Sequence, residues 1–183
     1  RLNTGAIVLN AQELRNSLYR GKLNQTLKDC ARNRSFREIM GTSSPRKRMV
    51  DEELVLRYFA LRETLPTYRP PLKRVLNDYM NNHRNDNDGD LESLRTSFEM
   101  ALEQTVTYLG HKAFRLINEQ GELIEQPVNR ALYDSQLLSF SWVVGGESSA
   151  ANVMSHLGQA YRSPDFLDSI RRATGDRTRT LLR

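Results

Sequence analysis

The stretch 84–90 has the residue types that come nearest to a metal site, because it is rich in Asp and Asn. In a calcium-binding EF-hand loop the sixth position is a glycine, and Gly89 can occupy it with two aspartates at the third and fifth positions. The first position is then Arg84, and the twelfth, which must supply a bidentate carboxylate, is Arg95. Since two cations stand where two anions are needed, we predict no calcium site here and expect Asp90 to cap the following helix.

The remaining residues of the sequence complete no catalytic or metal centre either. The histidines His83, His111 and His156 lack the spacing of metal ligands, and the single Cys30 excludes an internal disulfide or a Cys-based zinc site. There is neither a glycine-rich phosphate loop nor a Gly-x-Ser-x-Gly elbow, and a His-Asn-His nuclease site cannot be assembled. We therefore predict no catalytic residues, no metal ligands and no cofactor in this chain, and no turnover of substrate by the chain alone.

Positive charge is concentrated at the start of the chain. The 183 residues carry a net charge of +5, but residues 1–50 contain 11 Lys and Arg against 3 Asp and Glu. Arg46, Lys47 and Arg48 form a run within this region, and such a surface attracts phosphates. We predict that these three residues contact the DNA backbone. The alternatives are a solvated charged surface or contact with an acidic domain outside the chain.

The spacing of apolar residues predicts helices almost throughout. Leu14 and Leu18 share one helical face, and Asn10 and Glu13 have the spacing of a capping box. Further helices are predicted at 22–33 (with 35–40 continuing it or adding a turn), from Asp51 as the cap to Pro66, and at 72–80, 91–109, 128–142, 150–161, 165–173 and 176–183. Residues 111–127 fit either a strand or a helical turn. We predict an all-α, irregular bundle of about seven to nine short helices, forming one domain over residues 1–183.

Targeting signals are lacking in the sequence. No apolar run approaches the roughly 18 residues that span a bilayer, and no segment resembles a signal peptide. We therefore expect a cytoplasmic protein with no membrane partner. The chain opens at Arg1 without an initiator Met, which is how a fragment starts, so we expect part of a longer parent to be missing.

Several segments resemble a known family. Arg-Leu-Asn-Thr-Gly at 1–5 and the segment 9–21 look like the region that follows the ParB-like domain in GmrSD-type restriction proteins, a group that includes the phosphorothioation-sensing SspE proteins. The segment 48–61 is similar to a second signature of that family, and residues 76–80 and 166–177 also have counterparts. The resemblance extends over nearly the whole chain and is most specific in the first sixty residues.

The resemblance implies a ParB-like domain ahead of this chain, with residues 1–9 as the linker from it. In such proteins that domain carries an Asp-Gly-Gln-Gln-Arg motif associated with nucleotide hydrolysis, and a His-Asn-His region, where present, cuts DNA. By analogy Asn3 and Thr4 would approach the nucleotide, with Arg1 or Arg15 near its phosphates, and the parent would use a nucleoside triphosphate and Mg²⁺. The alternative is that the Asn-Thr-Gly turn only caps a helix.

The resemblance implies a regulatory and structural role in a nucleotide-dependent phage-defence protein. We expect the chain to relay the nucleotide state of the ParB-like domain and to contact DNA, with homo-oligomerisation left open. The alternatives are a stand-alone basic helical module that binds nucleic acid and a protein-interaction bundle. An Asp-Gly-Gln-Gln-Arg motif ahead of Arg1 in the parent sequence would distinguish the first from the others.

Overall fold

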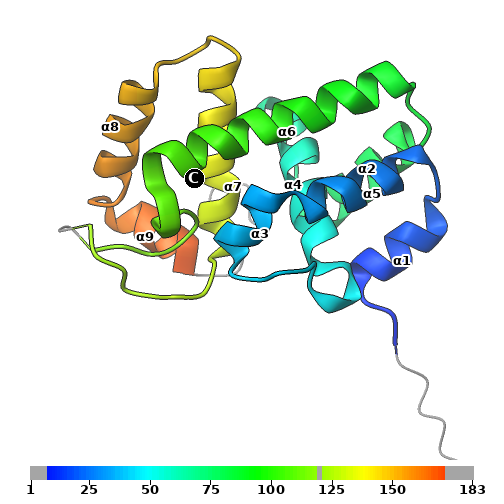
Figure 1. Cartoon of the computed structure of the whole chain (residues 1–183), viewed down its shortest axis with the longest axis horizontal. Coiled ribbons are helices and arrows are strands. Elements are labelled where there is room, and N and C mark those ends of the chain that lie inside the picture. Colours follow the sequence, from blue (N-terminus) through cyan, green and yellow to red (C-terminus); the bar gives the residue numbers. More distant parts are fainter. Residues whose placement is uncertain (1–7, 119–120, 172–183) are drawn as a thin grey trace, which may run out of the picture.

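The computed structural model describes residues 8–118 and 121–171, and within them the all-α prediction is confirmed (Figure 1). Residues 111–127, which the sequence left open, contain an isolated antiparallel bridge between Ile117 and Leu123. The helices are α1 (Ala11–Leu18), α2 (Lys22–Arg32), α3 (Arg34–Met40), α4 (Val50–Thr64), α5 (Leu72–His83), α6 (Asp88–Leu109), α7 (Arg130–Val144), α8 (Ala150–Ala160) and α9 (Pro164–Arg171), with 3₁₀ turns η1 (Lys47–Met49), η2 (Leu65–Thr67) and η3 (Gly110–Lys112).

The long helix α6 organises the molecule. In Figure 1 the helices α1, α2 and α5 lie towards its N-terminal end, α3 and α4 lie near its middle, and α7, α8 and α9 gather towards its C-terminal end. Its buried Phe98 meets Phe36 of α3 and Tyr58 of α4 edge to face, with ring centroids 5.6 and 5.5 Å apart. Such aromatic contacts add to the free energy gained by burying the rings, so this cluster ties three helices together.

The central helix α4 is buried on nearly all sides. Every residue from Leu54 to Leu61 is buried, including the charged Arg57. The helix packs against α2, α5, α6 and α7, which explains why it has no polar face along this stretch. Because α4 contacts both α1 and α7, its charged side chains can pair with residues of either helix.

The helix starts confirm one predicted cap and correct two others. Asn10 caps α1 through the predicted capping box with Glu13. Asp51 does not cap α4: the helix starts at Val50 and Asp51 lies in its first turn, where arginine side chains hold its carboxylate. Asp90 does not cap α6 either, because α6 starts at Asp88 and Asn87 accepts the hydrogen bond from the Asp90 amide. In both cases the helix begins earlier than expected, so the acidic side chain falls inside the first turn.

The pattern of hydrophobicity also bears on membranes. None of the helices in residues 8–118 and 121–171 combines the length and the apolar character needed to cross a bilayer. The predicted helix at 176–183 lies outside the described residues.

Candidate functional site

The first helix presents polar side chains to the protein and apolar ones to solvent. Gln12 and Arg15 are 1% and 3% exposed, whereas Leu14 and Leu18 are 44% and 61% exposed. Val8, just ahead of the helix, is also strongly exposed. This is the reverse of an ordinary amphipathic surface helix, whose apolar face packs on the core.

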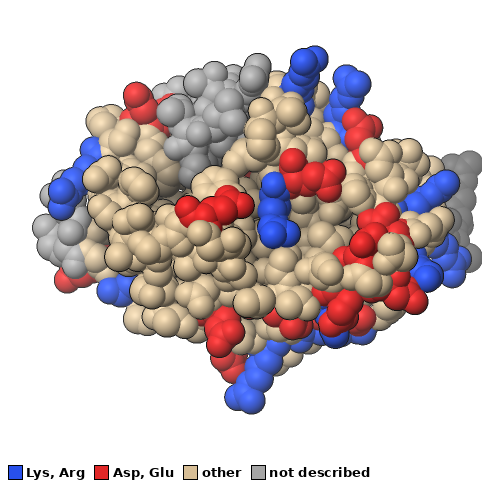
Figure 2. All heavy atoms as spheres, turned by 90° about the horizontal axis from the view of Figure 1, so that it is seen from above, with Lys and Arg blue, Asp and Glu red and all other residues tan. Residues whose placement is uncertain are grey.

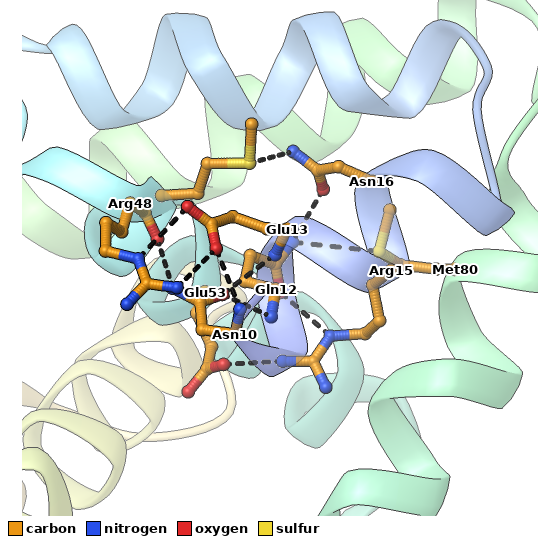
Figure 3. A network of polar contacts seen from close by, with 9 residues as sticks. Asn10, Gln12, Glu13, Arg15, Asn16, Arg48, Glu53 and Met80 are labelled. Carbon is orange, nitrogen blue, oxygen red and sulfur yellow. Dashed lines mark hydrogen bonds and ion pairs between the residues drawn. The ribbon is translucent and has the colours of Figure 1, made fainter. Parts of the chain in front are cut away.

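Hydrogen bonds from Arg15 fix the buried side of α1 (Figure 3). Its Nε donates to Gln12 Oε1 at 2.8 Å, and its Nη2 donates to Glu53 Oε2 on α4 at 2.5 Å. Burial lowers the pKa of Arg15 from its ordinary value, and the charge of Glu53 opposes that shift. Because a buried cation needs a partner, this contact is what allows an arginine to face inward here.

Asn16 adds a second contact between α1 and the start of α4. Its Nδ2 donates to Glu52 Oε2 at 2.7 Å and lies 3.0 Å from the sulfur of Met49. Asn16 also accepts a hydrogen bond from Gln12 at 2.8 Å. The polar side of α1 is therefore held on α4 by two consecutive glutamates, Glu52 and Glu53.

A clasp formed by Asn10, Glu13 and Arg48 closes the other end of α1 (Figure 3). The Glu13 carboxylate accepts from the Asn10 amide at 2.7 Å and from Arg48 Nη2 at 2.9 Å, and Asn10 Nδ2 donates to the Arg48 carbonyl at 2.7 Å. The hydrogen bond from Arg48, followed by that from the Asn10 backbone, lowers the pKa of Glu13. A helix cap and an ion pair thus share one carboxylate.

The clasp holds two residues in an unusual backbone conformation. Arg48 and Met49 have φ of 62° and 59°, in the left-handed region that side chains other than glycine rarely adopt. Two consecutive residues of this kind store strain that the surrounding contacts must sustain. The contacts of Arg48 with Asn10 and Glu13 of the clasp are among those that sustain this conformation.

The charged side chains continue from α4 into α7. Arg57 lies one helical turn beyond Glu53 and forms a buried ion pair with Asp134, to which its Nε donates at 3.0 Å and its Nη2 makes a second contact. Burial acts to lower the pKa of Arg57, but Asp134 and then Glu53 outweigh it, so the pKa lies above its ordinary value. Charged side chains thus follow one another from Arg15 of α1 through Glu53 and Arg57 of α4 to Asp134 of α7.

The structure places the predicted site residues in different situations. Arg1, Asn3 and Thr4 lie outside the described residues. Arg15 is committed to Gln12 and Glu53, so its guanidinium points into the protein.

The run Arg46, Lys47 and Arg48 is exposed, but two of its members are in ion pairs. Arg46 binds Asp51 at 2.6 Å, and Arg48 binds Glu13 at 2.9 Å. Lys47 makes no ion pair or side-chain hydrogen bond with any described residue. The three residues therefore do not act as three free cations.

Asp51 is a buried carboxylate that binds two arginines at once. It is 1% exposed and binds Arg37 Nη1 at 2.7 Å as well as Arg46. Burial raises its pKa, but the hydrogen bonds from Arg46 and Arg37 outweigh burial and set the pKa below its ordinary value. This carboxylate orders the loop that carries the basic run.

Two carboxylates of the rejected calcium loop are engaged by neighbouring side chains. Asp86 lies 2.7 Å from the Nδ1 atom of His83, and Asp88 pairs with Lys22 at 2.7 Å. Within residues 8–118 and 121–171, no three His, Cys, Asp or Glu side chains are grouped so that they could hold a metal ion.

Sequence reasoning missed Gln12, Glu53 and the pair Arg57–Asp134. Neither Gln12 nor Glu53 belongs to a motif that indicates a site. Arg57 and Asp134 are 77 positions apart, so no local pattern joins them. The one signal present was a charged residue at 57 within an otherwise apolar helical run.

Comparison with known proteins gives no relative: no family model, no curated protein and no solved structure matches the chain.

Proposed function

We propose that this chain is the helical docking and relay portion of a ParB-like, nucleotide-dependent phage-defence restriction protein. In this proposal the ParB-like domain ahead of residue 1 covers the outer face of α1, formed by Leu14 and Leu18. A change of nucleotide state in that domain shifts α1, and the shift passes to α4. Nucleotide chemistry, with a nucleoside triphosphate and Mg²⁺, belongs to the neighbouring domain.

The observation that carries the proposal is the orientation of α1. Leu14 and Leu18 lie one turn apart on an exposed face, while Arg15 and Gln12 occupy the buried one. Two leucines left in solvent beside a buried arginine favour a helix whose outer, apolar face is covered in the whole protein. The sequence resemblance supplies the occupant, because it places a domain directly ahead of this helix.

The contacts of α1 supply a route for the relay. The clasp around Arg48 joins the start of α1 to the strained start of α4, and Arg15 joins its middle to Glu53. Since Arg57 lies one turn from Glu53 and pairs with Asp134, a displacement of α1 changes the electrostatic environment as far as α7. A relay requires an element that changes arrangement, and in this proposal the strained junction before α4 is that element.

The role proposed for Arg15 changes with its geometry. The sequence resemblance suggested a contact with nucleotide phosphates, but its donors reach Gln12 and Glu53. We propose that Arg15 holds α1 on α4 instead. No step involving the nucleotide is assigned to it.

The proposal is tested in the intact parent with Leu14→Asp and Leu18→Asp combined. We expect the variant to fold but to lose the dependence of DNA cleavage on nucleotide. The matched control is Met100→Asp on α6, a residue that is 45% exposed and belongs to another surface. Cleavage that stays nucleotide-dependent in the double variant would refute the docking role.

An alternative, a module that binds nucleic acid by itself, is favoured by a different observation. Among residues 8–50, four cations make no ion pair with another described residue: Arg20, Lys28, Arg32 and Lys47. Salt-dependent binding of duplex DNA by this chain, together with no effect of the leucine substitutions in the parent, would support this alternative.

A further inference from the structure

The helix α1 has three faces rather than two. Successive residues of an α-helix are about 100° apart, so Gln12 and Arg15 mark the buried face and Leu14 and Leu18 the apolar face. The third face, with Asn16 and its neighbours, borders a groove between α1 and α2. The groove is open, has a volume of about 550 Å³ and is lined by Glu13, Asn16, Ser17, Arg20, Gly21, Asn24, Gln25, Lys28 and Met49.

The cations of this groove differ from most others in the first fifty residues. Six of the described cations there are in ion pairs: Arg15, Lys22, Arg34, Arg37, Arg46 and Arg48. Arg20 and Lys28, by contrast, make no ion pair with any residue of 8–118 or 121–171 and line the same groove. They can bind an anion without first breaking a contact within the protein.

The other groove residues complement the two cations. The Oδ1 atom of Asn24 accepts the Gly21 amide at 2.8 Å, which fixes the side chain and leaves its Nδ2 without a partner in the described part of the chain. Glu13, the carboxylate of the groove, is already paired with Arg48. A polar donor therefore stands beside the cations, and the one carboxylate that lines the groove is already paired with an arginine.

We propose that the α1–α2 groove binds the phosphodiester backbone of nucleic acid through Arg20 and Lys28. Phosphate oxygens are bound by Arg and Lys and by Ser, Asn and Gln side chains, which are the residue types that line this groove. An acidic peptide fits less well, because peptide grooves offer apolar anchors and Met49 is the one apolar side chain of the lining. Contacts of this kind are independent of base sequence.

The sequence suggested phosphate contacts for Arg46, Lys47 and Arg48, and the groove offers free cations that Arg46 and Arg48 do not. Those two arginines are tied to Asp51 and Glu13, so a phosphate would have to compete with a carboxylate at each. Figure 2 shows the molecule from above. Acidic and basic side chains are intermingled on this face, and they form no broad basic surface there. The groove also lies on a different face of α1 from the docking face, so its test is separate from that of the proposed function.

The test measures binding of fluorescein-labelled 20-base-pair duplexes, one of DNA and one of RNA, to the full 183-residue chain by fluorescence anisotropy. We expect the variant that combines Arg20→Gln and Lys28→Gln to bind at least tenfold more weakly at 50 mM NaCl. The logarithm of affinity falls with the logarithm of salt concentration, and each lost phosphate contact makes that slope less steep by about 0.9 on duplex DNA. The slope should therefore become less steep by about 2. Comparing the two duplexes decides which nucleic acid is the better ligand.

The matched control removes two charges elsewhere, Arg34→Gln on α3 and Lys73→Gln on α5, and should change affinity by less than about threefold. The proposal is overturned if the control loses as much affinity as the groove variant, if the chain binds neither duplex at 50 mM NaCl, or if it binds a poly-glutamate peptide in preference to both. If the groove variant has a lowered Tm, the single change Arg20→Gln carries the test, with an expected loss of at least threefold.

Discussion

Arg57 of α4 and Asp134 of α7 form a buried ion pair between helices that are far apart in the sequence. Both side chains are less than a tenth exposed, and the guanidinium contacts both carboxylate oxygens. Two parallel hydrogen bonds of this kind fix orientation as well as distance. The pair therefore sets how α7 lies on α4.

Removing one member of this pair should be costly. Asp134→Ala leaves the Arg57 guanidinium buried without a counter-charge, and we expect the free energy of unfolding to fall by about 3–5 kcal/mol. Replacing both residues, with Arg57→Met and Asp134→Leu, should recover a large part of that loss because no isolated charge remains. Urea unfolding followed by circular dichroism measures both; a double variant as unstable as the single one would contradict the interpretation.

Loss of the Arg15 contact should free α1 without unfolding the bundle. In Arg15→Ala the carboxylate of Glu53, 23% exposed, loses its cation, and we expect a local destabilisation of about 1–3 kcal/mol. Hydrogen exchange at the amides of α1 should then be faster by one order of magnitude or more, while α6 is unchanged. Arg20→Ala, which lies in the groove, is the control. Equal protection of α1 in wild type and Arg15→Ala would show that the contact does not hold the helix.

The Asp51 junction predicts a component of acid sensitivity. Its pKa in the folded chain is below the ordinary value of about 3.9, so the folded state favours the ionised carboxylate. Stability from Asp51 is then fully present above pH 4 and is lost as the pH falls through the lower folded pKa. We expect Asp51→Asn to be less stable than wild type at pH 7 and the difference to shrink below pH 4. A difference that stays constant from pH 7 to pH 2.5 would rule out this linkage.

The strained start of α4 can be tested at Met49. Val at this position should destabilise the chain by roughly 1–2 kcal/mol more than Gly, because a β-branched side chain is disfavoured at φ near +60° and Gly is not. Both variants remove the Met side chain, so the comparison isolates the backbone. Thermal unfolding of Met49→Val and Met49→Gly gives the difference; equal Tm values would mean that the junction is not strained.

Local patterns were sufficient to predict most helices and one important cap. The period of apolar residues located α4, α5 and α7, and the Asn10–Glu13 spacing gave the capping box. Asp90 was misassigned because Asn87, three residues earlier, is an equally good cap and lets α6 begin sooner. Helix boundaries depend on such competition between neighbouring polar residues.

The candidate site depended on long-range contacts that no local pattern encodes. A helix with Leu14 and Leu18 on one face and Arg15 on another gives no indication that the arginine is the buried side. That orientation follows from Glu53, which lies 38 positions away on α4. The basic run at 46–48 is visible in the sequence as charge, but the pairing of Arg46 with Asp51 and of Arg48 with Glu13 is seen only in the fold.

The proposed docking face of α1, formed by Leu14 and Leu18, can be probed directly by thiol labelling. Cys30, the natural cysteine, is buried, and burial raises its pKa to about 12, so it should react very slowly with a maleimide. Leu14→Cys and Leu18→Cys would each add one accessible thiol, with Met100→Cys as the control on α6.

The decisive measurement is the rate of maleimide labelling at positions 14 and 18 in the separate 183-residue chain and in the longer parent that the proposed function requires. The account predicts at least tenfold slower labelling of both positions in the parent, a rate that changes when nucleotide is added, and an unchanged rate at position 100. Equal rates in the two proteins, with or without nucleotide, would contradict it.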